Sequence, residues 1–172
     1  MNRFFLLGLV LLVLQSVAHA QDGNGFFSIY LVRHAEKESE AKDPSNPALS
    51  QCGELRAESI TRILSDIDLE KIYSTPYERT MATALPSAEA LQLEVETYNP
   101  RKLEEFSSLL IDRRQNALVV GHSNTTGVLA GLLAGQGGEA FDEEEYDRLY
   151  QVVVSGGQGQ INLFHQAFHC EQ

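Results

Sequence analysis

Residues 28–37 read Ser-Ile-Tyr-Leu-Val-Arg-His-Ala-Glu-Lys. The first five residues form a short apolar run that is typical of a buried strand, and this run ends abruptly at Arg33 and His34. In open α/β sheets, ligands bind beyond the carboxyl ends of the parallel strands, where loops lead into helices. We therefore expect Arg33 and His34 to lie at the ligand-binding edge of a sheet.

The rest of the chain alternates between short apolar runs and runs of helical period, which is typical of an α/β fold. We expect one helix with Ile60, Ile63, Leu64 and Ile67 on a single face, and others that start at Thr75-Pro76-Tyr77-Glu78 (a capping box), at Asn99-Pro100 and near residue 124. We expect strands at residues 28–32, 71–74, 94–97, 117–120, 149–155 and 160–165. The last two are joined by a glycine-rich turn and should be antiparallel. The predicted fold is a three-layer α/β sandwich whose mixed sheet has a parallel centre and an antiparallel edge.

Two further segments bring polar groups to the same edge of this sheet. Arg79 lies in the first turn of the helix after strand 71–74, and His122 follows strand 117–120 after one glycine. Two guanidiniums and two imidazoles in one crevice would repel each other unless an anion binds there. A phosphoryl group fits this requirement best.

The overall charge excludes some partners. The 172 residues include 24 acidic and 13 basic side chains, with a formal net charge of −11. Such a chain is a poor match for nucleic acid or for an anionic membrane surface. An anionic substrate must therefore bind in a locally positive pocket.

The first twenty residues have the three-part pattern of a secretory signal peptide. A basic start at Asn2-Arg3 precedes an apolar run at residues 4–14 and a small-residue cleavage site at Ala18-His19-Ala20. The apolar run is well short of the roughly 20 residues that a membrane-spanning helix needs. We expect residues 1–20 to be removed and residues 21–172 to form an exported domain, periplasmic or secreted, without stable membrane insertion.

Export makes the cysteines informative, because an oxidising compartment permits a disulfide between Cys52 and Cys170. Spacing alone does not reveal the geometry of the pair, so a bridge and two separate thiols both remain open. His165 and His169 lie on or just after a predicted strand, where a spacing of four residues does not place side chains together. We interpret both histidines as surface residues and predict no metal site.

Four segments together resemble the histidine phosphatase superfamily, whose fold is that of the phosphoglycerate mutases. The resemblance extends over about residues 28–155 and rests on Leu31-Val32-Arg33-His34-Ala35-Glu36-Lys37, Leu49-Ser50-Gln51-Cys52-Gly53, Tyr73-Ser74-Thr75-Pro76-Tyr77-Glu78-Arg79-Thr80 and Val119-Val120-Gly121-His122-Ser123-Asn124-Thr125. It implies that His34 is a nucleophile that becomes phosphorylated. It also implies that Arg33, Arg79 and His122 bind the phosphoryl oxygens, and that neither metal nor cofactor takes part.

A general acid must protonate the leaving oxygen, and the sequence offers two candidates. Family members place an acidic residue in a Leu-x-Glu context, which implies Glu105 in Leu103-Glu104-Glu105; the alternative is a solvent-facing position on a helix. Glu36 is a second candidate, with a salt bridge to a pocket arginine as the alternative role. Residues 142–145 are interpreted as a solvated acidic segment. Tyr146 and Tyr150 are expected in the core, with a place at the mouth of the crevice as the alternative.

The chain is similar to the small branch of the superfamily that includes the SixA-type phosphohistidine phosphatases. The expected function is a metal-independent phosphomonoester hydrolase that acts through a phosphohistidine on His34, with a small phosphorylated metabolite or phosphosugar as substrate. A phosphohistidine protein phosphatase is the first alternative. A non-catalytic module that binds a phosphorylated ligand is the second, and the oligomeric state remains open.

Overall fold

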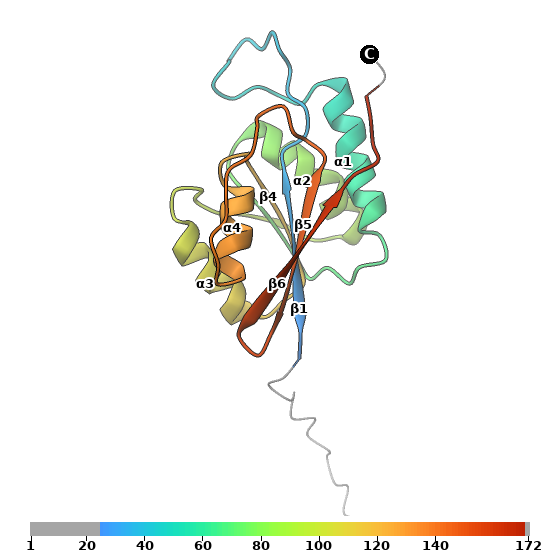
Figure 1. Cartoon of the computed structure of the whole chain (residues 1–172). Coiled ribbons are helices and arrows are strands. Elements are labelled where there is room, and N and C mark those ends of the chain that lie inside the picture. Colours follow the sequence, from blue (N-terminus) through green and yellow to red (C-terminus); the bar gives the residue numbers. More distant parts are fainter. Residues whose placement is uncertain (1–24, 171–172) are drawn as a thin grey trace, which may run out of the picture.

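The computed structural model describes residues 25–170, which form one six-stranded sheet with helices on both faces (Figure 1). The strand order is β3-β2-β4-β1-β5-β6. Strands β3, β2, β4 and β1 are parallel, whereas β5 is antiparallel to β1 and β6 is antiparallel to β5. The strands are β1 (Phe27–Arg33), β2 (Lys71–Ser74), β3 (Val95–Thr97), β4 (Ala117–Gly121), β5 (Arg148–Ser155) and β6 (Gln158–His165). The mixed sheet with a parallel centre and an antiparallel edge is therefore as predicted.

Alternation along β1 explains the three layers. Tyr30 and Val32 point into one hydrophobic cluster with residues of two helices, and Ile29 and Leu31 point into the opposite cluster with residues of two others. In Figure 1 the helices that supply these two clusters lie on opposite sides of the sheet. The first pair is α1 (Gln51–Ile63) and α2 (Glu78–Leu91), and the second pair is α3 (Leu103–Arg113) and α4 (Thr126–Leu133).

The predicted buried face of α1 is wrong at one position. The residues that α1 buries are Gly53, Arg56, Ala57 and Ile60, which are spaced at i, i+3, i+4 and i+7. Continuing this face leads to Leu64 and leaves Ile63 beside it, with 48% of its surface exposed. Because α1 ends at Ile63, the partly buried Ile67 packs from the following loop and not from the helix.

Two predicted helix starts also differ from the structure. Helix α2 begins at Glu78, and its N-cap Tyr77 makes no side-chain capping bond. The predicted capping hydroxyl, that of Thr75, instead bonds to Thr80 and His122. Helix α3 begins at Leu103 because residues 99–102 first close a turn, in which the Lys102 N–H donates to the Asn99 carbonyl at 3.1 Å.

The predicted signal peptide lies outside the described residues. Within residues 25–170, none of the helices is long and apolar enough to span a membrane.

Candidate active site

A polar pocket of about 360 Å³ lies where the carboxyl ends of β1, β2 and β4 meet. Arg33 and His34 reach it from the end of β1, Arg79 from the first turn of α2, and His122 from the segment after β4. The ring centroids of His34 and His122 are 5.5 Å apart. The structure thus brings together the four side chains that the sequence assigns to the phosphoryl site. The pocket is also lined by Lys37, Tyr77, Pro100, Arg101, Ser123, Asn124 and Glu143.

His34 is held in the form that a nucleophile requires. Its Nδ1 lies 2.8 Å from the carbonyl oxygen of Ala35, which can only accept, so Nδ1 carries the proton and Nε2 keeps its lone pair. The side chain is 3% exposed, and this burial lowers the pKa of His34 to about 3, with Arg33 and Arg79 adding to the effect. The ring is therefore neutral at physiological pH.

His122 is fixed by bonds from two directions. Its Nε2 lies 2.9 Å from the Thr75 hydroxyl, and its backbone N–H donates to the Thr125 hydroxyl at 2.9 Å. Burial lowers the pKa of His122 to about 4, and Arg79 and Arg33 lower it further. Within the described chain Nδ1 has no partner. In the tautomer in which Thr75 donates to Nε2, Nδ1 carries a proton that it can donate to a ligand.

Arg33 is held by backbone carbonyls of a distant loop. Its Nη1 donates to the carbonyls of Asp142, Glu143 and Glu145, and the ring of Tyr146 lies 4.1 Å from the guanidinium carbon. The sequence predicts a solvated acidic segment at residues 142–145, and 142–144 are exposed, but it does not predict that backbone carbonyls of this segment bond to Arg33. It also favoured a core position for Tyr146, whose ring lies 6.2 Å from that of His34.

Arg79 is joined through Thr83 to Ala35, the residue that follows His34. The Thr83 hydroxyl donates to the Arg79 carbonyl at 2.7 Å and accepts from the Ala35 N–H at 3.0 Å. The Arg79 guanidinium carbon lies 4.9 Å from the ring of Tyr77. This network fixes the start of α2 relative to His34.

Four buried guanidinium nitrogens have no hydrogen-bond partner among residues 25–170, and one of them, Nη1 of Arg56, lies outside the pocket. The other three belong to pocket residues. They are Nε of Arg33 and both Nε and Nη1 of Arg79. A buried charged donor without a partner costs a few kcal/mol, and an oxyanion relieves this cost by accepting charge-assisted bonds. Burial also lowers the pKa of both arginines. The pocket is therefore built to accept a group with several negatively charged oxygens, and a phosphoryl group has this chemistry.

The structure does not bring either predicted general acid into the pocket. Glu105 pairs with Lys102 at 3.0 Å, has a side chain that is 71% exposed, and borders a separate groove beside α3. The carboxylate of Glu36 accepts hydrogen bonds from Nε and Nη2 of Arg56 in α1, at 2.9 and 2.6 Å. Of the acidic side chains that the structure describes, only Glu143 lines the pocket, and it pairs with Lys37 at 3.4 Å.

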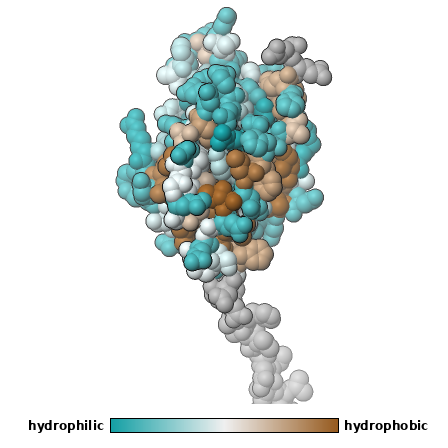
Figure 2. All heavy atoms as spheres, in the orientation of Figure 1, coloured by the Kyte–Doolittle hydropathy of each residue, from teal (hydrophilic) through white to brown (hydrophobic). Residues whose placement is uncertain are grey.

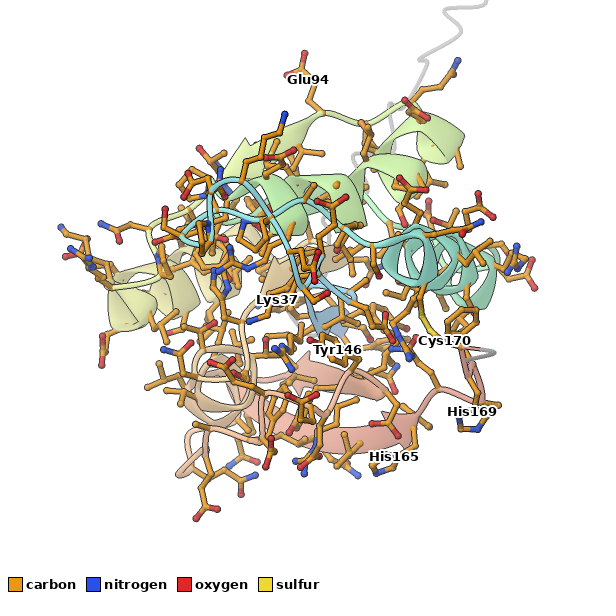
Figure 3. The ribbon with its side chains drawn as sticks, turned by 90° about the horizontal axis from the view of Figure 1, so that it is seen from above. Lys37, Glu94, Tyr146, His165, His169 and Cys170 are labelled. Atoms are coloured by element: carbon orange, nitrogen blue, oxygen red, sulfur yellow. A yellow bond between two sulfur atoms is a disulfide. The ribbon has the colours of Figure 1, made fainter. Side chains whose placement is uncertain are left out.

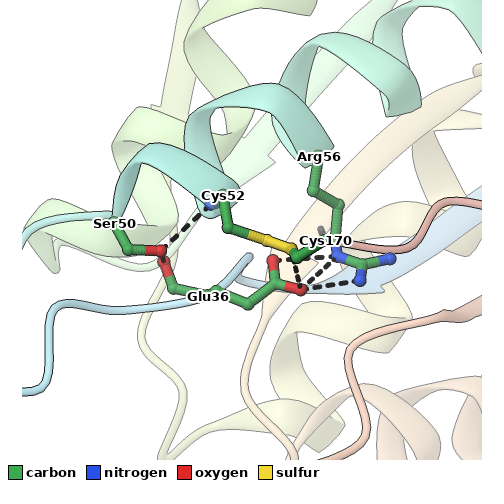
Figure 4. Close-up of a disulfide and its surroundings, with 6 residues drawn as sticks. Glu36, Ser50, Cys52, Arg56 and Cys170 are labelled. Carbon is green, nitrogen blue, oxygen red and sulfur yellow. Dashed lines mark hydrogen bonds and ion pairs between the residues drawn. A yellow bond between two sulfur atoms is a disulfide. The ribbon is translucent and has the colours of Figure 1, made fainter. Parts of the chain in front are cut away.

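Cys52 and Cys170 form a disulfide that joins the start of α1 to the C-terminal segment across 118 positions (Figure 4). The sulfur of Cys170 lies 3.6 Å from a carboxylate oxygen of Glu36. Beside it, Gly53 packs so closely on the backbone of Glu36 that a Cβ would lie 2.1 Å from that residue's carbonyl oxygen. The loop after His34 is therefore packed closely against the start of α1. In the described part of the chain, the closest grouping of potential metal ligands consists of Glu36 and these two bonded cysteines.

The two C-terminal histidines lie away from the pocket. Figure 3 shows Lys37 and Tyr146 near the middle of the molecule, whereas His165 and His169 lie toward one side. The exposed ring of His165 is 2.8 Å from a carboxylate oxygen of Asp147. This arrangement agrees with the interpretation of both histidines as surface residues.

A larger groove of about 460 Å³ lies between α1 and β6, where Figure 2 shows hydrophobic side chains gathered. Its walls are mostly apolar and include Ile63, Leu149 and Phe164. It contains neither a cluster of cations nor a histidine pair. The polar pocket, although smaller, is therefore the candidate active site.

Comparison with known families supports this choice. The model of the histidine phosphatase superfamily (branch 1) matches residues 29–108. Phosphoserine phosphatase 1 of Hydrogenobacter thermophilus is 42% identical over 71 residues. This stretch covers 39% of the chain and 34% of the relative, so the match spans about a third of the relative's length.

Solved structures share the fold at lower sequence identity. The protein histidine phosphatase SixA complexed with tungstate has a TM-score of 0.65 and 18% identity, and the match covers 81% of this chain and 97% of SixA. The alpha-ribazole phosphatase of Shigella flexneri has a TM-score of 0.68 and 14% identity, and the match covers 85% of this chain and 100% of that phosphatase. At these identities the likeness establishes the fold alone.

Proposed function

We propose that this chain is a histidine phosphatase that hydrolyses phosphomonoesters through a phosphohistidine formed on His34, and the match of residues 29–108 to the superfamily model supports this. One observation carries the proposal. A buried, neutral histidine with a free Nε2 shares a pocket with three guanidinium nitrogens that lack partners among the described residues. The substrate that we propose is a small phosphorylated metabolite or phosphosugar.

The reaction proceeds in two displacements. The Nε2 lone pair of His34 attacks phosphorus, and the P–N bond forms as the ester P–O bond breaks. The leaving oxygen takes up a proton and departs as the alcohol. Water then attacks phosphorus, the P–N bond breaks, and inorganic phosphate and neutral His34 are regenerated. One water is consumed and no electrons are exchanged.

The other pocket residues stabilise charge and position the phosphoryl group. Arg33 and Arg79 bind its equatorial oxygens, and His122 donates a further hydrogen bond. Because Arg33 is held by the carbonyls of residues 142–145, its guanidinium is already oriented before substrate binds. These groups neutralise the phosphoryl charge without a Lewis acid, so we propose a metal-independent reaction.

The test is hydrolysis of p-nitrophenyl phosphate by the purified mature chain in excess EDTA. We expect turnover in EDTA and a loss of at least about a thousandfold in His34→Ala. His169→Ala is the matched control, because it removes an exposed histidine outside the pocket and should retain activity. Unchanged turnover in His34→Ala would refute the nucleophile. Phosphate binding without turnover would instead indicate a non-catalytic binding module.

The substrate class is tested by a screen of small phosphate esters and phosphosugars against phosphohistidine peptides. Two observations support a small substrate. The similar relative is named a phosphoserine phosphatase, and the pocket has a volume of about 360 Å³. We expect kcat/KM to be highest for a small ester. A preference for the phosphohistidine peptide would favour a protein phosphatase instead.

We also propose that the enzyme is exported and that residues 1–20 are its signal peptide. The composition of these residues supports this, and so does the Cys52–Cys170 disulfide, because disulfides persist in oxidising compartments. We expect protein recovered from the periplasm or medium to begin at Gln21. A protein that keeps Met1 and stays in the cytosol would refute export.

A further inference from the structure

We propose that Arg101 forms a second anion subsite beside the phosphoryl site, so that the preferred substrates are phosphomonoesters whose alcohol carries a carboxylate or another acidic group. The inference rests on the proposed phosphatase function and specifies the substrate class of the same pocket. The observation behind it is that some cationic side chains around the pocket form ion pairs with carboxylates and others do not.

Arg101 lacks the carboxylate partner that most cations of this chain have. Acidic side chains outnumber basic ones by 24 to 13, and most of the described lysines and arginines form an ion pair. Arg101 forms none with any described carboxylate, although it lines the polar pocket. The paired cations are Lys37, Arg56, Arg62, Lys71, Lys102, Arg113 and Arg148.

The backbone at Arg101 is fixed by a tight turn. The Arg101 N–H donates to the side-chain oxygen of Asn99 at 3.0 Å, and the Lys102 N–H closes the turn on the Asn99 carbonyl. Pro100 at the second position of the turn restricts it further. The guanidinium therefore projects from a defined point on the rim after β3.

The strand order gives the pocket a positive side and a neutralised side. The phosphoryl-binding residues follow β1, β2 and β4, and Arg101 follows β3 at one end of this row. On the other side, Lys37 after β1 and Glu143 before β5 form an ion pair of 3.4 Å. A second acidic group on a bound substrate gains no net attraction from the Lys37–Glu143 pair and is attracted by Arg101. It should therefore point toward β3.

The chemistry of arginine suits this role. A guanidinium can bind a carboxylate through two parallel hydrogen bonds, which an alcohol or amine on the substrate cannot accept in the same way. Arg101 is exposed, so water competes for it and the gain is moderate. A hydrogen-bonded charge pair of this kind corresponds to a preference of about tenfold in kcat/KM.

The test compares esters that differ only in the acidic group. The pairs are 3-phosphoglycerate with glycerol 3-phosphate, and O-phosphoserine with O-phosphoethanolamine. For each pair we expect the wild type to have a kcat/KM ratio of about ten in favour of the acid. Arg101→Gln should bring this ratio close to one. Lys102→Gln removes the same charge one residue away and outside the pocket, and should leave the ratio unchanged.

The subsite is refuted if the wild type shows no preference, if Arg101→Gln keeps it, or if Lys102→Gln abolishes it equally. Calorimetric binding of the same esters to His34→Ala repeats the comparison without turnover. Tighter binding of the acidic esters that depends on Arg101, together with a wild-type chain that hydrolyses none of them, supports the subsite and refutes the phosphatase. Hydrolysis of p-nitrophenyl phosphate without any preference between the paired esters supports the phosphatase and refutes the subsite.

Discussion

The backbone N–H of Ala35 donates to the side-chain hydroxyl of Thr83 at 3.0 Å, and this bond joins the loop that carries His34 to helix α2. The same hydroxyl donates to the carbonyl of Arg79. Thr83 is buried and does not line the pocket, so it acts on the reaction through the residues that it positions. The proposed nucleophile loop and the proposed phosphoryl-binding residue Arg79 thus share the hydroxyl of Thr83.

Replacing Thr83 by valine keeps the volume of the side chain but removes this hydroxyl. We expect kcat for p-nitrophenyl phosphate to fall about tenfold, because small displacements of reacting groups are costly. We also expect the free energy of unfolding to fall by about 1–2 kcal/mol, since the Ala35 N–H loses its partner. Thr83→Ser should restore most of kcat. An unchanged kcat in the valine variant, or a serine variant as slow as the valine variant, would contradict this role of the hydroxyl.

The two pocket histidines should make stability depend on pH. Burial lowers the pKa of His34 to about 3 and that of His122 to about 4, whereas an unfolded chain has histidine pKa values of about 6.5. Between these values the unfolded state binds more protons than the folded state, so stability rises with pH. Urea unfolding should show stability falling as the pH is lowered from about 6.5 toward 4. His34→Gln should reduce this slope, and an unchanged slope would contradict a buried neutral His34.

Glu36 should contribute to stability and not to proton transfer. Glu36→Gln leaves the guanidinium of Arg56, whose side chain is 6% exposed, without its anionic partner. We expect a loss of about 3 kcal/mol in the free energy of unfolding. If Glu36 were the general acid, its loss would slow alkyl phosphates much more than p-nitrophenyl phosphate, whose leaving group needs no proton. We expect the ratio of the two rates to stay constant, and a strong fall in this ratio would restore Glu36 as the acid.

The disulfide should stabilise the folded domain. It closes a loop of 118 positions and holds the C-terminal segment, in which the ring of Phe168 lies 4.8 Å from the Arg56 guanidinium. Reduction, or the double substitution Cys52→Ser with Cys170→Ser, should lower the free energy of unfolding by about 2–4 kcal/mol. The double variant serves as the control, because its urea midpoint should not respond to reductant. A wild-type midpoint that is the same with and without reductant would contradict this role.

The sequence predicts the strands and the pocket cations because both depend on local patterns. The apolar run before Arg33 and the run before His122 specify buried parallel strands, and the carboxyl-edge rule then places the following residues together. Ile63 shows the limit of this reasoning. Two faces of α1 have helical spacing, and the face that is buried carries Gly53, which packs on the Glu36 backbone in a contact that helical spacing does not predict.

The contacts that the sequence does not predict join residues far apart in the chain. The carbonyls that hold Arg33 come from residues about 110 positions away. Because every residue has a backbone carbonyl, the sequence does not indicate which ones bond to Arg33. Thr75 has the sequence of a helix cap, but its hydroxyl bonds to His122, 47 positions away. Glu143 belongs to an acidic segment that the sequence predicts to be solvated, and nothing in its composition indicates that its side chain borders the pocket.

The central claim is that His34 becomes phosphorylated during turnover. The most direct measurement is rapid quenching of the enzyme with substrate under alkaline conditions, which preserve phosphohistidine, followed by mass spectrometry of the peptide that contains residue 34. We predict one phosphoryl group on His34 that forms and decays within the turnover cycle and is absent in His34→Ala. Steady hydrolysis with no phosphate on His34, or with the phosphate on His122, would contradict the account.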